Sequence, residues 1–116
     1  MQLQLYGKKI WLYRKSIDFR ASIDGLCHLV SSELKLSVKD GVYLFSNRRR
    51  DKLKCLSWHK NGFVLCYKRL EKSLFSMGAN DDRVIELSMS EMSWLLAGLE
   101  WHKMRDWSEL NYDKFS

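Results

Sequence analysis

The sequence predicts an α+β domain: a small, mostly antiparallel sheet, made of a three-stranded meander plus one or two extra strands, packed by two helices. Three observations predict it. Short apolar runs at 42–45, 53–58 and 63–70 are bounded by turn residues, which is typical of strands. Apolar residues between 19 and 34 recur with helical spacing. A Ser-x-x-Glu capping signal at Ser88 precedes a second helical pattern.

Length and composition indicate one folded unit. The chain has 116 residues, 46% of them hydrophobic, including five tryptophans, which excludes disorder and allows a single core. No apolar run approaches the roughly 18–20 residues of a membrane span, and the N-terminus has no apolar signal-peptide core. We therefore expect a cytoplasmic protein without membrane contact, with one domain over 1–105 and a polar C-terminal tail over 106–116.

The N-terminal part predicts a strand and then a helix. Lys9–Tyr13 alternates in the manner of a short strand. The helix is expected from about residue 18 to about residue 34, with Ser16 or Asp18 as its N-cap, because a short side-chain oxygen can accept from free first-turn N–H groups. Asp18 could instead pair with Arg20. The apolar stripe of this helix consists of Phe19, Ile23, Leu26, Cys27, Val30 and Leu34.

The meander has a strong hairpin signal at Asn61-Gly62. If these two residues form the turn, Trp58 faces Leu65; if 59–62 forms a four-residue loop, Trp58 faces Phe63. Both registers place the same side chains on one face, because strand side chains alternate. We expect this face to be the core face. Its members are Leu56, Trp58, Phe63, Leu65 and Tyr67, and the mixed opposite face carries Cys55, Ser57, Val64, Cys66 and Lys68.

The C-terminal part predicts one more strand and one more helix. Val84–Leu87 is a short strand candidate. Ser88 and Glu91 fit a capping box, in which each side chain satisfies the other residue's backbone N–H. The helix is expected over about 89–100, with a buried face made of Met92, Leu95, Leu96 and Leu99.

Residues with catalytic or metal-binding chemistry are few and scattered. The three histidines do not pair with cysteines or carboxylates at a zinc-like spacing, so we expect no metal and no cofactor. Cys27, Cys55 and Cys66 are expected to be reduced thiols, although Cys55 and Cys66 could meet across the hairpin. Asp81-Asp82 could serve a nuclease, but adjacent acids beside Gly78 are more typical of a solvated turn. The chain is therefore not expected to be an enzyme.

Charge is distributed unevenly along the chain. The net charge is +6, but residues 47–72 alone hold nine basic and two acidic residues. Such asymmetry indicates a polyanion or an acidic protein as partner. The residues expected to bind nucleic acid are Arg48, Arg49, Arg50, Lys52, Lys54, Lys68 and Arg69. Trp58 and Tyr67 could stack on bases, but their place on the expected core face favours burial.

Three blocks give the chain a family resemblance. The first is Ile17-Asp18-Phe19-Arg20 with Ile23-Asp24-Gly25-Leu26. The second runs from Leu44 to Glu71 and includes Asn47-Arg48-Arg49-Arg50-Asp51-Lys52-Leu53-Lys54 and Tyr67-Lys68-Arg69-Leu70-Glu71. The third runs from Ser88 to Trp101 and ends Leu95-Leu96-Ala97-Gly98-Leu99-Glu100-Trp101. With these blocks the chain resembles the TnpB or Orf2 accessory proteins of bacterial insertion sequences of the type numbered sixty-six. It departs from the family pattern at Arg50, where glycine is usual.

The resemblance implies a non-enzymatic accessory protein of transposition, encoded beside a separate transposase. Combined with the basic hairpin, it favours an accessory protein that binds DNA. The alternative is an interaction module that docks on the transposase of the same element without touching DNA, with an aromatic tail residue such as Trp107 as anchor. A nuclease is the third and least favoured hypothesis. The sequence does not determine the oligomeric state.

Overall fold

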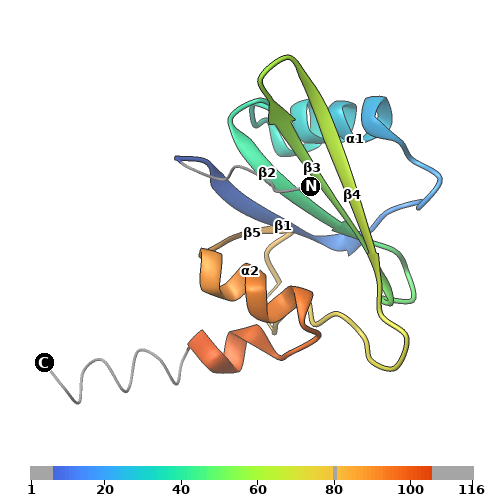
Figure 1. Cartoon of the computed structure of the whole chain (residues 1–116), viewed down its shortest axis with the longest axis vertical. Helices are drawn as coiled ribbons and strands as arrows, with labels where there is room; N and C mark the ends of the chain where they lie inside the picture. The colour runs from blue at the N-terminus through green and yellow to red at the C-terminus, as the bar shows by residue number, and fades with distance from the viewer. Residues whose placement is uncertain (1–6, 80, 106–116) are drawn as a thin grey trace, which may run out of the picture.

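The computed structural model describes residues 7–79 and 81–105 (Figure 1). Its strands are β1 (Lys9–Ser16), β2 (Gly41–Ser46), β3 (Lys52–His59), β4 (Gly62–Arg69) and β5 (Val84–Leu87). Its helices are α1 (Ile23–Leu29), which continues as the π-helix η1 (Val30–Leu34), and α2 (Met89–Leu96). Residues 101–105 are also helical. The α+β class is confirmed. The predicted tail, 106–116, lies outside the described residues.

The five strands form one sheet in the order β4-β3-β2-β1-β5. β2, β3 and β4 are the predicted antiparallel meander, and β5 adds to β1 antiparallel. β1 and β2 are parallel, because α1 lies between them and carries the chain back across the sheet. None of the helices within the described ranges is long and apolar enough to cross a membrane.

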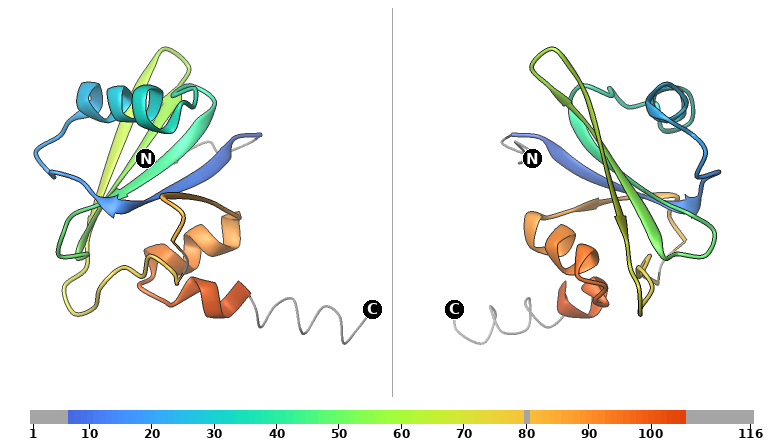
Figure 2. Two further views of the ribbon diagram at one scale, coloured as in Figure 1. Left: turned by 180° about the vertical axis from the view of Figure 1, so that it is seen from behind. Right: turned by 45° about the vertical axis from the view of Figure 1, so that its right-hand side comes forward.

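Both faces of the sheet are covered, so the molecule has two apolar cores (Figures 1 and 2). On one face, Leu26 of α1 and Val30 of η1 pack on Tyr43 and Phe45 of β2. We refer to this side as the α1 face. On the other side, the α2 face, the core consists of Ile10, Leu12, Val42, Leu44, Leu53, Cys55, Phe75, Leu87, Met92, Leu95 and Trp101. The central strand β2 is therefore buried throughout.

The expectation of a single core face was wrong in part. Leu56 is fully buried on the α1 face, as predicted, whereas Tyr67 is 54% exposed because it lies beyond the reach of α1. Cys55 and Ser57 were placed on the mixed face, yet both are buried. Alternation assigned the residues to faces correctly, but it could not show that α2 covers the second face.

The hairpin adopts the register in which Trp58 pairs with Phe63 and Leu56 with Leu65, one of the two predicted alternatives. His59 pairs with Gly62, so the turn residues are Lys60 and Asn61 rather than Asn61 and Gly62. Lys60 takes the positive φ of 53° that the tight turn requires. The Trp58 and Phe63 rings then meet edge to face at 4.9 Å between centroids.

α1 begins later than predicted, at Ile23, with Ser22 as its N-cap, so neither Ser16 nor Asp18 caps it. Asp18 instead accepts from the backbone N–H of Arg20 at 3.0 Å and pairs with its guanidinium at 2.6 Å. These contacts hold a turn before the helix, and the hydrogen bonds from Arg20 lower the pKa of Asp18 to about 2. Phe19 therefore lies outside the helix.

α2 has the predicted capping box: Ser88 accepts from the Glu91 N–H at 3.1 Å, and Glu91 accepts from the Ser88 N–H at 2.8 Å. The helix ends at Leu96, four residues before the predicted end. Gly98, at φ 78°, donates to the Leu95 carbonyl, and Leu99 donates to the Trp94 carbonyl, the pair of bonds that defines a Schellman motif. Leu99, predicted to be buried, is 41% exposed because the chain has left the helix.

Candidate nucleic-acid interface

The turn between β2 and β3 is built around Asn47. Its side-chain oxygen accepts from the Lys52 N–H at 3.0 Å, and its amide donates to the Asp51 carboxylate at 2.6 Å. Its carbonyl accepts from the Arg50 N–H at 3.2 Å. The bond from Asn47, together with the charges of Arg49 and Lys52, holds the pKa of Asp51 below its usual range. The turn is therefore closed by its own side chains and presents its arginines from a fixed backbone.

The segment that follows β4 is attached to this turn. The Leu70 N–H donates to the Asp51 carbonyl at 2.8 Å, and the Phe75 N–H donates to the Arg50 carbonyl at 2.7 Å. Figure 2 shows the turn and this segment side by side at one end of the sheet. Residues 47–52 and 69–75 therefore form one surface, although they are about twenty residues apart in the sequence.

Cations gather at this end of the sheet. The pairing of Lys52 with Arg69 places both side chains on the α1 face, and Arg48 and Arg49 are exposed in the turn. Among the described residues, neither Arg48 nor Arg49 makes a side-chain hydrogen bond or ion pair. Arg69 pairs with Glu71 at 2.9 Å, but both side chains remain largely exposed. We define the cationic end as Arg48, Arg49, Lys52, Arg69 and Lys72.

The other three predicted cations make hydrogen bonds to other groups of the protein. The Lys54 ammonium donates to the carbonyls of Phe19 and Ala21, each at 2.7 Å. Lys68 lies on the opposite face of β4 and donates to the Leu96 carbonyl at 2.7 Å, which satisfies the C-terminal end of α2. Arg50 donates to the Ser46 hydroxyl and, at 2.8 Å, to the Arg14 carbonyl. The structure thus brings four of the seven residues together at one surface.

Arg50 has a φ of 68°, which is the left-handed conformation that favours glycine. Burial, followed by the charge of Arg14, lowers the pKa of its guanidinium. The Arg50 side chain thus joins this left-handed turn to β1, through its hydrogen bond to the Arg14 carbonyl.

Replacing Arg50 with Ala is expected to lower the free energy of unfolding by about 2 kcal/mol, because the buried Ser46 hydroxyl and the Arg14 carbonyl lose their donor. Arg50→Gly should cost about 1 kcal/mol less than Arg50→Ala, because glycine relieves the left-handed strain. Urea unfolding of the three proteins measures both differences. Equal stabilities of the two variants would show that the turn carries no such strain.

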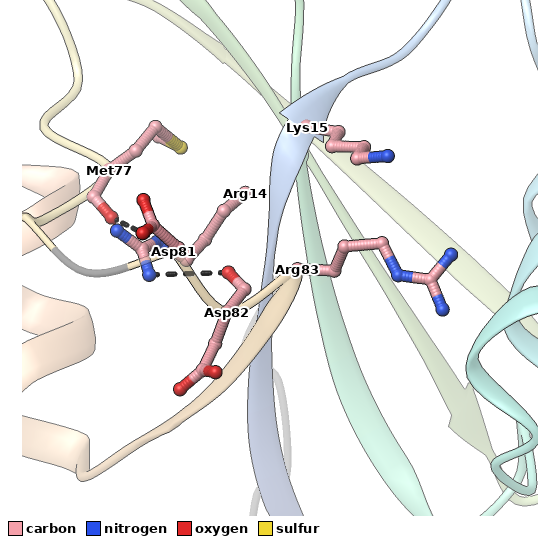
Figure 3. Close-up of a pocket in the computed structure, with 6 residues that line it drawn as sticks. All are labelled: Arg14, Lys15, Met77, Asp81, Asp82 and Arg83. Atoms are coloured by element: carbon pink, nitrogen blue, oxygen red, sulfur yellow. Dashed lines mark hydrogen bonds between the residues drawn. The ribbon is translucent and has the colours of Figure 1, made fainter.

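Asp81 and Asp82, the nuclease candidates, line a pocket of about 200 Å³ (Figure 3). Arg14 also lines it and donates to the main-chain carbonyls of Met77 at 2.7 Å and Asp82 at 3.2 Å. In Figure 3 the side chains of Lys15 and Arg83 extend to the other side of β1 from the two aspartates. Within residues 7–79 and 81–105, no three His, Cys, Asp or Glu side chains lie together as metal ligands would. Among the described residues, the pocket thus provides two carboxylates without a third ligand.

The three cysteines are free thiols. Cys55 and Cys66 do lie directly opposite each other across the hairpin, as considered from the sequence. Burial, and to a lesser degree Cys66, raises the pKa of Cys55 to about 12, so it is a poor nucleophile near neutral pH.

Sequence reasoning missed one feature of this surface, the exposure of Tyr67. The signal that could have found it is position: Tyr67 is the last aromatic residue before Lys68-Arg69, at the charged end of its strand. Lys72, the last residue of the basic stretch 47–72, lies on the segment that the backbone bonds hold against the turn.

The fold and the site define a small basic α+β module with exposed cations at one end of its sheet. The family described as IS66 Orf2 like protein matches residues 8–106, and the chain belongs to this family. Two relatives come from Sinorhizobium fredii (strain NBRC 101917 / NGR234). Uncharacterized protein y4jC is 33% identical over 100 residues, which cover 85% of this chain and 86% of the relative. Uncharacterized protein y4hO is 29% identical over 101 residues, which cover 85% and 88%. No solved structure matches the chain.

The members of this family are accessory proteins of insertion sequences. The chain therefore has an accessory role in transposition.

Proposed function

We propose that the protein is a non-enzymatic accessory factor of DNA transposition that binds DNA through its cationic end. Arg48, Arg49, Lys52 and Arg69 contact phosphates, while Arg50, Lys54 and Lys68 hold the surrounding backbone in place. The protein acts in the cytoplasm together with the transposase of the same element, which carries out the strand chemistry.

One observation carries this proposal: Arg48 and Arg49 project from a closed turn, exposed and, among the described residues, without a hydrogen-bond or ion-pair partner. Long cationic side chains on a rigid backbone suit phosphates, because little ordering is needed on binding. The cationic end contains five basic residues against Asp51 and Glu71, a formal charge of +3. It is therefore a compact positive surface.

The test is a salt titration of DNA binding by wild type and by the triple variant Arg48→Gln, Arg49→Gln, Lys52→Gln. If four cations neutralise phosphates, the logarithm of the association constant should fall with the logarithm of salt at a slope of about −3.6 on duplex DNA. The triple variant should flatten this slope by about 2.7 and lower the affinity at least about tenfold. Fluorescence anisotropy of labelled duplex and single strands measures both quantities.

The matched control removes three charges at the other end of the sheet, through Lys9→Gln, Lys39→Gln and Lys60→Gln. These residues are exposed and lie near the start of β2 and the hairpin turn. The control variant has the same net charge as the triple variant, so a general charge effect would weaken both equally. Equal slopes for the two variants would contradict the assignment of DNA binding to the cationic end.

The alternative function is docking on the transposase without DNA contact. One observation favours it: in the described part of the chain, the outer edge of β4 pairs with no other strand. An open strand edge can accept an extended segment of a partner. If wild type shifts no DNA at low salt but still captures purified transposase of the same element, docking replaces DNA binding as the function.

A further inference from the structure

Tyr67 stands out as a large aromatic side chain on the α1 face, beside the cationic end. It pairs across the hairpin with Lys54, and the next pair on the same face is Lys52 with Arg69. Two residues of strand span about 6.6 Å, a distance that long basic side chains easily bridge. Tyr67 is 54% exposed, although aromatic residues on a sheet facing a helix are usually covered.

The Tyr67 ring is also held in position. Phe19 lies against it, with 5.7 Å between ring centroids and a tilt of 56°. Lys54 fixes Phe19 in turn, because its ammonium lies 4.4 Å from the centroid of the Phe19 ring and donates to the Phe19 carbonyl. Two rings and one ammonium group thus form a preorganised unit whose outer member is exposed.

The neighbours of Tyr67 indicate which ligand would use it. Toward the cationic end, its neighbours in β3 and β4 are Lys52, Lys54 and Arg69, so cations rather than a broad apolar patch border the ring on that side. An aromatic ring among cations matches a nucleotide strand, whose bases stack while its phosphates pair with the charges. A duplex hides the faces of its bases, so only an unpaired base can stack in this way.

We propose that Tyr67, supported by Phe19, is a stacking platform for an unpaired base, and that the preferred ligand of the cationic end is single-stranded or locally opened DNA. This inference rests on the proposed DNA binding and specifies its substrate. The basic side chains follow the backbone of the strand, and the tyrosine ring distinguishes a strand with free bases from a closed duplex.

The experiment compares three ligands of equal length: single-stranded DNA, duplex DNA and a single strand whose nucleotides are abasic. Tyr67→Ala is expected to lower the affinity for single-stranded DNA about tenfold, because one stacked base is lost. Its affinity for the abasic strand should be unchanged, and its salt slope should equal that of wild type, because no charge is altered. Tyr67→Phe keeps the ring and should bind single-stranded DNA within about twofold of wild type.

Met89→Ala is the matched control, because Met89 is a similarly exposed apolar residue, 59% exposed, on α2. Thermal unfolding of each variant confirms that the fold is retained. Equal losses by Tyr67→Ala on the normal and abasic strands, or no loss on either, would overturn the stacking platform while wild-type DNA binding still stands. If wild type binds none of the three ligands at low salt, the proposed function fails and this inference fails with it.

Discussion

Replacing Trp101 with Ala is expected to lower the free energy of unfolding by about 4 kcal/mol, the range found when large aromatic residues are removed from cores. Trp101 is only 1% exposed and is the largest side chain of the core on the α2 face. Its indole N–H donates to the Ser76 carbonyl at 2.7 Å. A Cβ on Gly78 would come within 3.1 Å of its ring, so the chain passes closely over it. Denaturant unfolding followed by circular dichroism measures the loss.

Two further variants show how much of this loss comes from the indole N–H and from the apolar volume of the buried side chain. Trp101→Phe keeps much of the apolar volume but removes the indole donor, so it should cost about 2 kcal/mol. Leu99→Ala removes a neighbouring apolar side chain that is 41% exposed and should cost less than about 1 kcal/mol. If Trp101→Ala were no more destabilising than Leu99→Ala, the residues after α2 would not be part of the core.

Replacing Arg105 with Ala is expected to lower the free energy of unfolding at neutral pH by about 2 kcal/mol. Arg105 forms an ion pair with Glu91, whose side chain is only 8% exposed and also belongs to the capping box of α2. Removing one partner leaves a buried charge without compensation. The expected loss is below the roughly 3–5 kcal/mol of fully buried pairs, because the Arg105 side chain is 36% exposed.

The Glu91–Arg105 ion pair also determines how the stability difference between wild type and Arg105→Ala depends on pH. Burial raises the pKa of Glu91, but the hydrogen bonds from Arg105 and Ser88 and the charge of Arg105 outweigh it, so the pKa lies below its ordinary value of 4.5. A carboxylate with a depressed pKa stabilises the fold above its unfolded pKa, and this contribution is lost as pH falls through the folded pKa. The stability difference between wild type and Arg105→Ala should therefore be full at pH 6–7, values chosen well above the ordinary pKa, and should shrink below about pH 4.5.

Two controls distinguish the effect of the Glu91–Arg105 pair on stability from the effect of removing any positive charge. Lys103→Ala breaks the exposed Lys103–Glu100 pair and should change stability by less than about 0.5 kcal/mol. In a Glu91→Gln background, Arg105→Ala should cost less than in wild type, because the buried charge is already gone. A double-mutant cycle with zero coupling between Glu91 and Arg105 would refute the assigned role of the pair.

Local sequence patterns determined most elements of this protein. The strand runs, the stripe of α1, β5 and the capping box at Ser88 were all predicted, because neighbouring residues carry the alternation, the 3.6-residue period and the cap chemistry. Where the predicted helix boundaries were wrong, a different local interaction set the boundary. Asp18 holds a turn with Arg20 instead of capping α1, and Gly98 ends α2 early. The early end of α2 was visible in the sequence, because Gly98 lies near the expected helix end.

The candidate site was predictable only as a basic stretch. The sequence by itself determined the strands, the uneven charge, the arginine turn and the family blocks, because each of these depends on residues close together in the chain. Only the tertiary structure decided that β1 lies parallel to β2, that α2 covers the second face, that Lys54 and Lys68 bind carbonyls, and that Tyr67 remains exposed. The physical reason is that alternation fixes the face on which a side chain lies, whereas contacts between distant segments fix whether that face is covered.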